Sequence, residues 1–200
     1  DLDTVLDSPI IADPLRLYDF CPITDGSAAL VFCPESVAEE YVPDDEYAVV
    51  SGIGGATDTH VVHERDDPTI MGGVVESSDE AYEMAGLGPD DLDVAELHDM
   101  FTILEFLQLE GIGVADQGEA WELAMDGYTA KDGELPINTS GGLKSKGHPL
   151  GASGVAQGVE IYEQLVGEAG PRQVEADVGL ACNVGGFGNC VITTIMEAAE

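Results

Sequence analysis

Three short segments of the sequence combine a histidine or a cysteine with glycine in ways that could support catalysis. His98 lies between a predicted strand at 94–97 and a predicted helix at 101–109. At such a junction its imidazole could donate or accept a proton. His148 lies between Gly147 and Pro149, just before the clearest helical pattern, whose first amides could bind a polarised oxygen. Cys182 opens the third segment. Taken singly, His98 is better explained as a surface histidine and Cys182 as an inert buried thiol.

The loop around His148 is rich in glycine, which lets a backbone approach a ligand closely. Two lysines lie in it, and in a chain with only six basic residues this clustering predicts contact with an anion such as a phosphate. The alternative is a loop that needs glycine and carries two surface lysines. The expected ligand-binding residues are Gly141, Gly142, Lys144, Lys146 and Gly147.

The segment that begins at Cys182 continues with Asn183, Gly185 and Gly186. The glycines could direct backbone N–H groups at a developing oxyanion. The alternative is a glycine turn between two strands, with no catalytic part.

Predicted strands and helices alternate along the chain, which indicates an α/β fold with helices packed on a mixed sheet. Strands are expected at 28–32, 47–53, 94–97, 178–181 and 190–195. Helices are expected at 77–85, 101–109, 119–125 and 152–166, and a helical turn at 36–40. Residues 1–23 are expected to be extended, and Gly54 and Gly55 to end the second strand.

Two helices carry more specific signals. Ser77 and Glu80 match a capping box at the start of one helix, and Gly86 matches its C-cap. The apolar face of the helix at 152–166 is expected to be Ala152, Val155, Ala156, Val159, Tyr162 and Val166.

The composition is strongly acidic. Forty Asp and Glu residues against six Lys and Arg give the 200-residue chain a formal net charge of -34, which excludes nucleic acid and anionic lipid as partners. Self-repulsion at this level favours a protein that works in concentrated salt, where the Debye length is about 3 Å at 1 M. We therefore expect a halophilic, cytoplasmic protein; an acidic partner-binding face in ordinary salt is the alternative.

The sequence gives no sign of a membrane span or a metal site. It contains no apolar run of the length that a transmembrane helix needs. The four cysteines form no CxxC pair, and the histidines are not spaced like zinc ligands. We expect no metal.

Taken in order, the segments resemble the C-terminal half of a thiolase. GGLKSKGHPLGASG, at 141–154, is similar to the histidine loop of that family almost residue for residue. HDMF, at 98–101, resembles the HDxF variant of sterol-carrier-type and archaeal thiolases, and CNVGGFG, at 182–188, resembles the final glycine turn. IADPLRLYDFCPITDGSAALVF, at 11–32, resembles the end of the thiolase N-terminal domain.

This resemblance implies a fold and a domain division. It implies a thiolase-like C-terminal domain at 44–200, with a mixed five-stranded sheet covered by helices on both faces. Residues 1–43 would be the end of an otherwise missing N-terminal domain, comprising a loop segment, its last strand at 28–32, and a linker at Pro43 and the acidic run after it.

The resemblance also implies Claisen condensation or thiolysis of acyl-CoA and 3-ketoacyl-CoA thioesters, with coenzyme A thioesters as substrates and no covalently bound cofactor. By the family pattern, His148 would activate a nucleophilic cysteine, and His98 would hold the enolate oxygen. Asn183, Gly185 and Gly186 would form the second oxyanion site. A homodimer or homotetramer is implied, and in some archaeal relatives a small zinc-ribbon/OB-fold partner subunit.

Two departures from the family pattern matter. The nucleophilic cysteine belongs to the family's N-terminal domain, and neither Cys21 nor Cys33 matches it, so we expect this chain by itself to be inactive. The second departure concerns the acid/base thiol, which the family places in the HDxF motif or in the final glycine turn. At the first of these places this chain has Met100, which cannot transfer protons. At the second, aligning the glycines puts Asn183 at the thiol position and Cys182 one residue before it. We expect Cys182 to be the acid/base, with a structural role as an equal alternative.

Two other functions remain open. One is a non-catalytic subunit that binds coenzyme A or an acyl thioester within a split or multi-subunit complex, although the presence of both histidines favours descent from an active enzyme. The other is a structural or interaction module, which would not bind coenzyme A.

Overall fold

The computed structural model describes residues 1–42 and 47–199 of the chain. Its centre is a mixed four-stranded sheet with the strand order β3-β6-β5-β4. β4 and β5 are parallel, and the other neighbouring pairs are antiparallel. Beyond β4, Ile137 forms a single parallel bridge with Ala95, which occupies the place of the expected fifth strand. The strands are β3 (Ala48–Thr57), β4 (Val94–Leu97), β5 (Val178–Gly185) and β6 (Cys190–Ala198).

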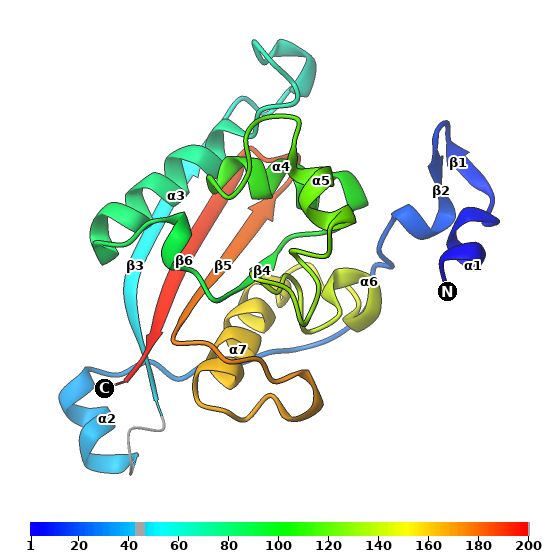
Figure 1. The fold of residues 1–200 in the computed structure, drawn as a ribbon. Helices are drawn as coiled ribbons and strands as arrows, with labels where there is room; N and C mark the ends of the chain where they lie inside the picture. Colours follow the sequence, from blue (N-terminus) through cyan, green and yellow to red (C-terminus); the bar gives the residue numbers. More distant parts are fainter. Residues whose placement is uncertain (43–46, 200) are drawn as a thin grey trace.

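Helices cover both faces of the sheet, as predicted (Figure 1). α3 (Gly72–Ala85) packs on β3 and β6, and α4 (Thr102–Gly111) packs beside α3 on the same side. α7 (Ser153–Leu165) lies on the opposite face, against β4 and β5. The remaining helices are α1 (Leu2–Leu6), α2 (Glu35–Tyr41), α5 (Ala120–Met125) and α6 (Gly142–Lys146), with 3-10 turns at Leu17–Asp19, Val62–Glu64, Pro89–Asp91 and Gly170–Arg172.

The alternation of side chains along β5 divides the interior into two cores. Leu180, Cys182 and Val184 point into the larger core, beneath α3 and α4. Ala181 points into the smaller core, where Ile161 of α7 meets the sheet. Because successive side chains in a strand point to opposite faces, neighbours in the β5 sequence belong to different layers of the molecule.

The predicted capping box is wrong, because α3 begins at Gly72, five residues before Ser77. Ser77 is fully buried in mid-helix and its Oγ lies 2.9 Å from Oγ1 of Thr193 on β6. Glu80 instead accepts a hydrogen bond of 2.9 Å from the backbone N–H of Gly55. The C-cap prediction is confirmed, since Gly86 has a φ of 72°.

β3 does not end at Gly54 and Gly55 but continues to Thr57. At position 54 glycine is needed because a side chain would collide with α3, and it does not end the strand. A Cβ atom at Gly54 would overlap the carbonyl oxygen of Ser77, and one at Gly52 would overlap that of Ala81. The glycines therefore let α3 approach the strand backbone closely.

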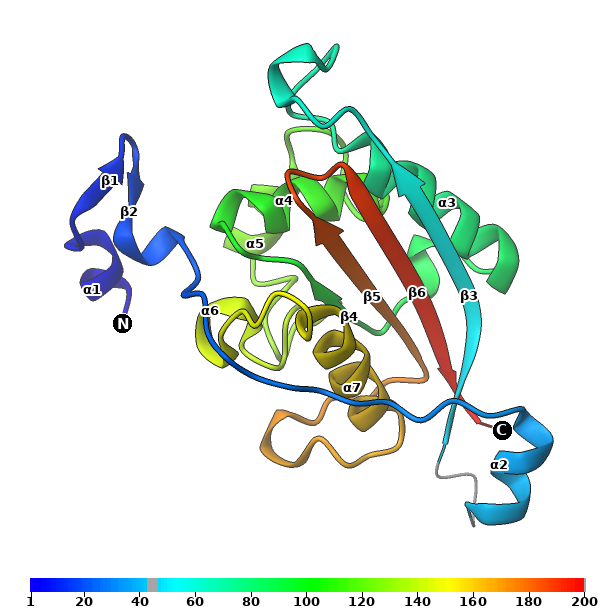
Figure 2. The same ribbon diagram turned by 180° about the vertical axis from the view of Figure 1, so that it is seen from behind.

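The first 42 residues form less regular structure, stretched along the side of the sheet domain (Figure 2). Residues 1–23 are not simply extended, because α1 and a small hairpin of β1 (Ile10–Ala12) and β2 (Leu15–Arg16) form there. Residues 28–32 are extended but form no strand, so that prediction is wrong. Val31 is 94% exposed and Phe32 71%, since no neighbouring strand lies against them. The helical turn expected at 36–40 is confirmed by α2, and the expected linker and domain boundary at 43–46 lie outside the described residues.

Replacement of Gly54 by alanine should destabilise the fold by about 2–3 kcal/mol, because α3 must move away from β3 to admit the methyl group. Thermal and denaturant unfolding at high salt would measure the change. Gly88→Ala is the control, since its nearest neighbour would lie 3.8 Å from the new Cβ atom. Equal stability of the two variants would contradict the close approach.

Candidate active site

His98 and His148 come together at one end of the sheet. His98 follows the last residue of β4, and His148 lies in the loop between α6 and α7. Their ring centroids are 4.9 Å apart with an interplanar angle of 82°, an edge-to-face contact. Both side chains are buried, with exposures of 3% and 5%. His98 is therefore not a surface histidine, and the geometry joins two of the sequence-predicted site residues.

The extended segment at 20–24 links the two histidine-bearing loops. The N–H of Cys21 donates to the carbonyl of Met100 at 3.0 Å, and the N–H of His148 donates to the carbonyl of Pro22 at 3.2 Å. The N–H of Thr24 then donates to the carbonyl of His148 at 3.4 Å. Cys21 thus lies beside both loops, although sequence analysis gave it no part in the site.

Asn183 fixes the protonation of the His98 ring. Its Nδ2 lies 3.1 Å from Nδ1 of His98. An amide NH2 group only donates, so Nδ1 accepts and the ring hydrogen is on Nε2. Burial lowers the pKa of His98 to about 4, and the charges of His148 and Lys146 add to the effect. At neutral pH His98 is therefore an uncharged ring whose free nitrogen is a hydrogen-bond donor.

Ser153 binds Nδ1 of the His148 ring. Nδ1 of His148 lies 2.7 Å from Oγ of Ser153, whose own hydrogen is donated to the carbonyl of Pro149 at 3.2 Å. With the hydroxyl hydrogen on the Pro149 carbonyl, Oγ accepts from Nδ1–H and Nε2 of His148 carries a lone pair. Burial lowers the pKa of His148, while the charge of Asp99 opposes this shift. The paired rings thus offer one hydrogen-bond donor and one proton acceptor.

Cys182 does not contact His98 or His148. Its side chain points to the opposite face of β5, is fully buried in the larger core, and accepts a 3.7 Å hydrogen bond from Oγ1 of Thr193. Burial raises the pKa of the thiol to about 12. The placement favours the structural alternative over proton transfer, because the pleat turns the thiol away from the histidines.

Asn183, the next residue of β5, faces the histidine pair. Of the predicted residues in this segment, Asn183 contacts His98, whereas Gly185 and Gly186 lead into the turn between β5 and β6. Gly186 has a φ of 61°, which explains the need for glycine there.

Asp99 holds the glycine-rich loop in place. Its Oδ1 accepts a hydrogen bond of 2.7 Å from the N–H of Leu143, in the first turn of α6. Gly142 has a φ of 62°, and a Cβ there would overlap the Asp99 carboxylate. Gly147 has a φ of 87°, and its Cβ would lie 2.5 Å from Oγ1 of Thr24. Gly141, with a φ of 89°, is the N-cap of α6. These glycines give the loop its shape and close packing.

The two loop lysines are engaged inside the chain. Lys146 Nζ lies 2.9 Å from Oε2 of Glu96, a fully buried residue of β4. Lys144 donates to the carbonyl of Phe20 at 2.7 Å and lies 4.7 Å from the centre of the Tyr18 ring. Both ammonium groups fasten the loop to its neighbours, which favours a structural role for these lysines; their contact with a phosphate stays a prediction.

Two acidic side chains, the fully buried Glu96 and the half-buried Glu105, support the site together with Asn138, and sequence analysis missed all three. Glu96 accepts hydrogen bonds from the N–H and the hydroxyl of Ser140, at 3.0 and 2.7 Å. Asn138 accepts from the N–H of Leu97 at 2.8 Å and donates to Glu105 at 3.0 Å. A glutamate within a fully buried strand was the signal available for Glu96.

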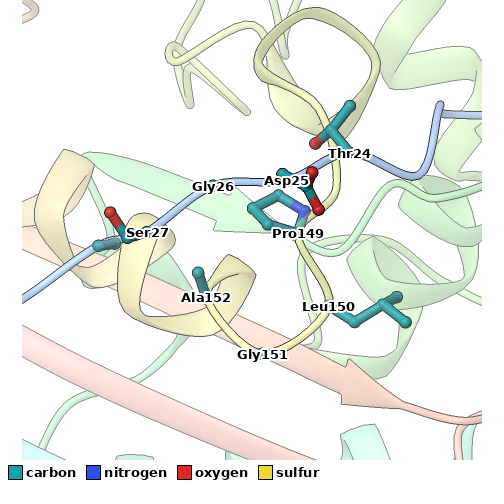
Figure 3. A pocket seen from close by; sticks show the side chains of 9 residues that line it. Thr24, Asp25, Gly26, Ser27, Pro149, Leu150, Gly151 and Ala152 are labelled. Carbon is teal, nitrogen blue, oxygen red and sulfur yellow. The ribbon is translucent and has the colours of Figure 1, made fainter.

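A hollow of about 410 Å³ lies directly beside His148. Figure 3 shows the extended segment at 24–27 facing the loop at 149–152 across it. Oγ1 of Thr24 is buried there, and no hydrogen bond to it is formed by the described residues. The hollow thus lies next to the turn that carries His148, whose own side chain is buried.

The described residues contain no group of three or more His, Cys, Asp or Glu arranged to hold a metal ion. No helix within 1–42 and 47–199 is long and apolar enough to cross a membrane.

Comparison with known proteins identifies the family. Residues 54–198 match the family model described as "Thiolase C-terminal domain-like". The chain belongs to the thiolase family. It is 45% identical over 197 residues to the acetyl-CoA acetyltransferase of Methanothermobacter thermautotrophicus, covering 98% of this chain and 51% of that protein. It is 39% identical over 200 residues to human sterol carrier protein 2, covering 98% of this chain and 36% of that protein.

Solved structures share the thiolase fold at lower sequence identity. The Ltp2-ChsH2(DUF35) aldolase superposes with a TM-score of 0.81 at 22% identity, covering 99% of this chain and 51% of that one. A monomeric SCP2-thiolase like protein type 1 from Mycobacterium smegmatis superposes with a TM-score of 0.68 at 20% identity, covering 96% and 38%. The chain thus spans about half the length of the acetyl-CoA acetyltransferase it matches.

Glu105→Gln should stabilise this thiolase domain at pH 8 by about 1–3 kcal/mol. Burial, with the nearby charge of Asp99, raises the pKa of Glu105 from 4.5 to about 7. The folded state therefore binds the proton of Glu105 more tightly than the unfolded state does. The resulting contribution to the free energy of unfolding is fully present below pH 4.5 and is lost as pH rises through 7. Unfolding curves at pH 4 and pH 8 would measure this. A gain of equal size at both values would contradict the raised pKa.

Proposed function

We propose that the chain is the C-terminal half of an acyl-CoA acyltransferase of the thiolase type. Its reaction is the Claisen condensation of acyl-CoA, or thiolysis of a 3-ketoacyl-CoA. The family membership and the similarity to an acetyl-CoA acetyltransferase support this activity. Alone, the chain is expected to be inactive, because neither Cys21 nor Cys33 matches the family nucleophile.

The observation that carries the proposal is the pair of buried histidines with ring centroids 4.9 Å apart, whose Nδ1 atoms are bound by Asn183 and Ser153. A thioester reaction needs a base that accepts a thiol proton and a donor that holds the developing oxygen anion. His148 offers the lone pair on Nε2 and His98 the hydrogen on Nε2. One pair of rings supplies both needs.

The proposed acyl transfer has two steps. Nε2 of His148 takes the proton of a cysteine thiol supplied from outside this chain, and the thiolate attacks the thioester carbonyl. Collapse of the tetrahedral adduct breaks the C–S bond, and the coenzyme A sulfur leaves with the proton from His148. In the second step, a second base takes an α-proton from a second acyl-CoA, and Nε2–H of His98 stabilises the enolate. The enolate attacks the acyl-enzyme carbonyl, the C–S bond to the enzyme cysteine breaks, and the cysteine sulfur takes the proton from the second base.

The hollow beside His148 is the proposed entry for the thioester end of the substrate. Its lining at 24–28 and 149–152 contains one charged side chain, Asp25, and is otherwise uncharged, which suits an uncharged, narrow arm. Since Lys144 and Lys146 have partners in the chain, we assign them the role of shaping this entry. Assembly into a homodimer or homotetramer, and a small partner subunit, are part of the proposal. So is a salt-rich cytoplasm, which the formal charge of -34 supports.

His148→Ala should reduce thiolysis of a 3-ketoacyl-CoA by at least about 10³-fold, because the nucleophile then lacks its base. The rate of loss of the 3-ketoacyl thioester, followed in the native protein at high salt, gives the measurement. Wild-type rates would contradict the assignment. Tight coenzyme A binding in a wild-type protein without turnover would favour the non-catalytic binding subunit.

Cys182→Ala should keep the thiolysis rate within about threefold of wild type while lowering stability by about 1 kcal/mol. The reason is that its side chain fills the core on the far face of β5. Rate and unfolding midpoint, measured on the same preparation, separate the two effects. A loss of activity as large as that of His148→Ala would restore the catalytic role for this thiol.

A further inference from the structure

We propose that Gln157 of α7 is a positioning residue: through Asn183, it sets the tautomer of His98 and so makes Nε2 a hydrogen-bond donor. This inference rests on the proposed function for its consequence, but the tautomer itself can be observed without any reaction.

The starting point is the orientation of the Gln157 amide. Its Nε2 lies 3.2 Å from the backbone carbonyl of Glu96 and 3.0 Å from that of Cys182. Backbone carbonyls only accept hydrogen bonds, so both hydrogens of this NH2 group are used by β4 and β5. Gln157 is 1% exposed, so no water competes for these bonds. The amide oxygen must therefore point away from the two carbonyls.

The orientation of Gln157 determines that of Asn183. Oε1 of Gln157 accepts from Nδ2 of Asn183 at 2.9 Å. The flipped Asn183 would place two amide oxygens against each other, which is unfavourable in a buried site. The second hydrogen of the same NH2 group is directed at Nδ1 of His98, 3.1 Å away. Nδ1 accepts it, and the ring hydrogen stays on Nε2.

The packing of α7 against β5 leaves room for this relay. A Cβ atom at Gly154 would lie 2.9 Å from Cγ of Asn183. Gly154 and Gln157 are three residues apart, on neighbouring positions of one helix face. The glycine admits the Asn183 side chain to the position from which it reaches both Gln157 and His98.

The relay also explains why the sheet and the site are coupled. The two carbonyls that orient Gln157 belong to neighbouring parallel strands, and His98 follows the end of one of them. Without Gln157, Asn183 can turn its oxygen toward Nδ1 of His98. The ring hydrogen then moves to Nδ1, and Nε2 presents a lone pair that repels an enolate oxygen.

The test is the nitrogen NMR spectrum of ring-labelled histidine in the native protein at high salt and neutral pH, with His98→Asn identifying the signals of His98. In the wild type, Nδ1 of His98 should be unprotonated and Nε2 protonated. A protonated Nδ1 in the wild type would overturn the inference, and this measurement needs no variant that perturbs the fold.

Two variants test the relay itself. Gln157→Met should convert a large share of His98 to the Nδ1–H form, and Asn183→Asp should convert nearly all of it, because a carboxylate only accepts. Gln164→Met is the matched control: Gln164 is equally buried on α7, but its side-chain partners are Thr139, Glu160 and the segment at 172–174. It should leave the His98 signals unchanged. Wild-type signals in Gln157→Met would overturn the proposal.

Activity separates this inference from the proposed function. If His98 stabilises the enolate, Gln157→Met should lower kcat by about 10²-fold with little change in KM, as loss of an oxyanion donor does. A tautomer shift with an unchanged kcat would support the relay and overturn the catalytic role given to His98. A fall in kcat without a tautomer shift would overturn the relay.

Discussion

The pleat of β5 is the constraint on which the site depends. Adjacent residues of this strand must face opposite layers, so one register supplies both a core and a surface that faces the histidine pair. Cys182 fills the layer under α3 and α4, and Asn183 reaches His98 on the other side. A shift of one residue would bury the amide among apolar groups and expose the thiol. Every contact of the histidine pair with the sheet follows from this register.

Polar groups around the histidines form a connected set, and the fully buried ones among them cannot rely on water. Gln157 and Asn183 satisfy the donors and acceptors near His98, and Ser153 does so for His148. On the loop side, Glu96 binds Ser140 and Lys146. Leaving one such group unpaired costs about 1–3 kcal/mol, so the network resists the flips that would change either tautomer. Both rings stay uncharged because burial disfavours the protonated form.

Three of the few basic residues in this acidic chain form bonds inside the domain, close to the candidate site or on α7. Lys144 and Lys146 fasten the glycine-rich loop, and Arg172 binds Glu160 and Glu163 on α7. The scarce positive charges thus stabilise the interior and the loops close to the site. Lys144 and Lys146 are close together in the sequence because both anchor the loop before His148. The same closeness in the sequence suggested a phosphate contact.

The sequence by itself determined the local elements and the members of the site that carry recognisable motifs. β4 was predicted to the residue, α7 to within one residue at each end, and His98 and His148 came from their motifs. Only the tertiary structure decided which faces are buried. The residues of α7 turned into the interior include Ser153, Gln157, Glu160 and Gln164, and the predicted apolar face is only half-buried. A polar side chain can be buried where partners from distant segments satisfy it, and helical periodicity contains no information about those partners. The same reason hid the role of Asn183, because its two partners are 26 and 85 residues away.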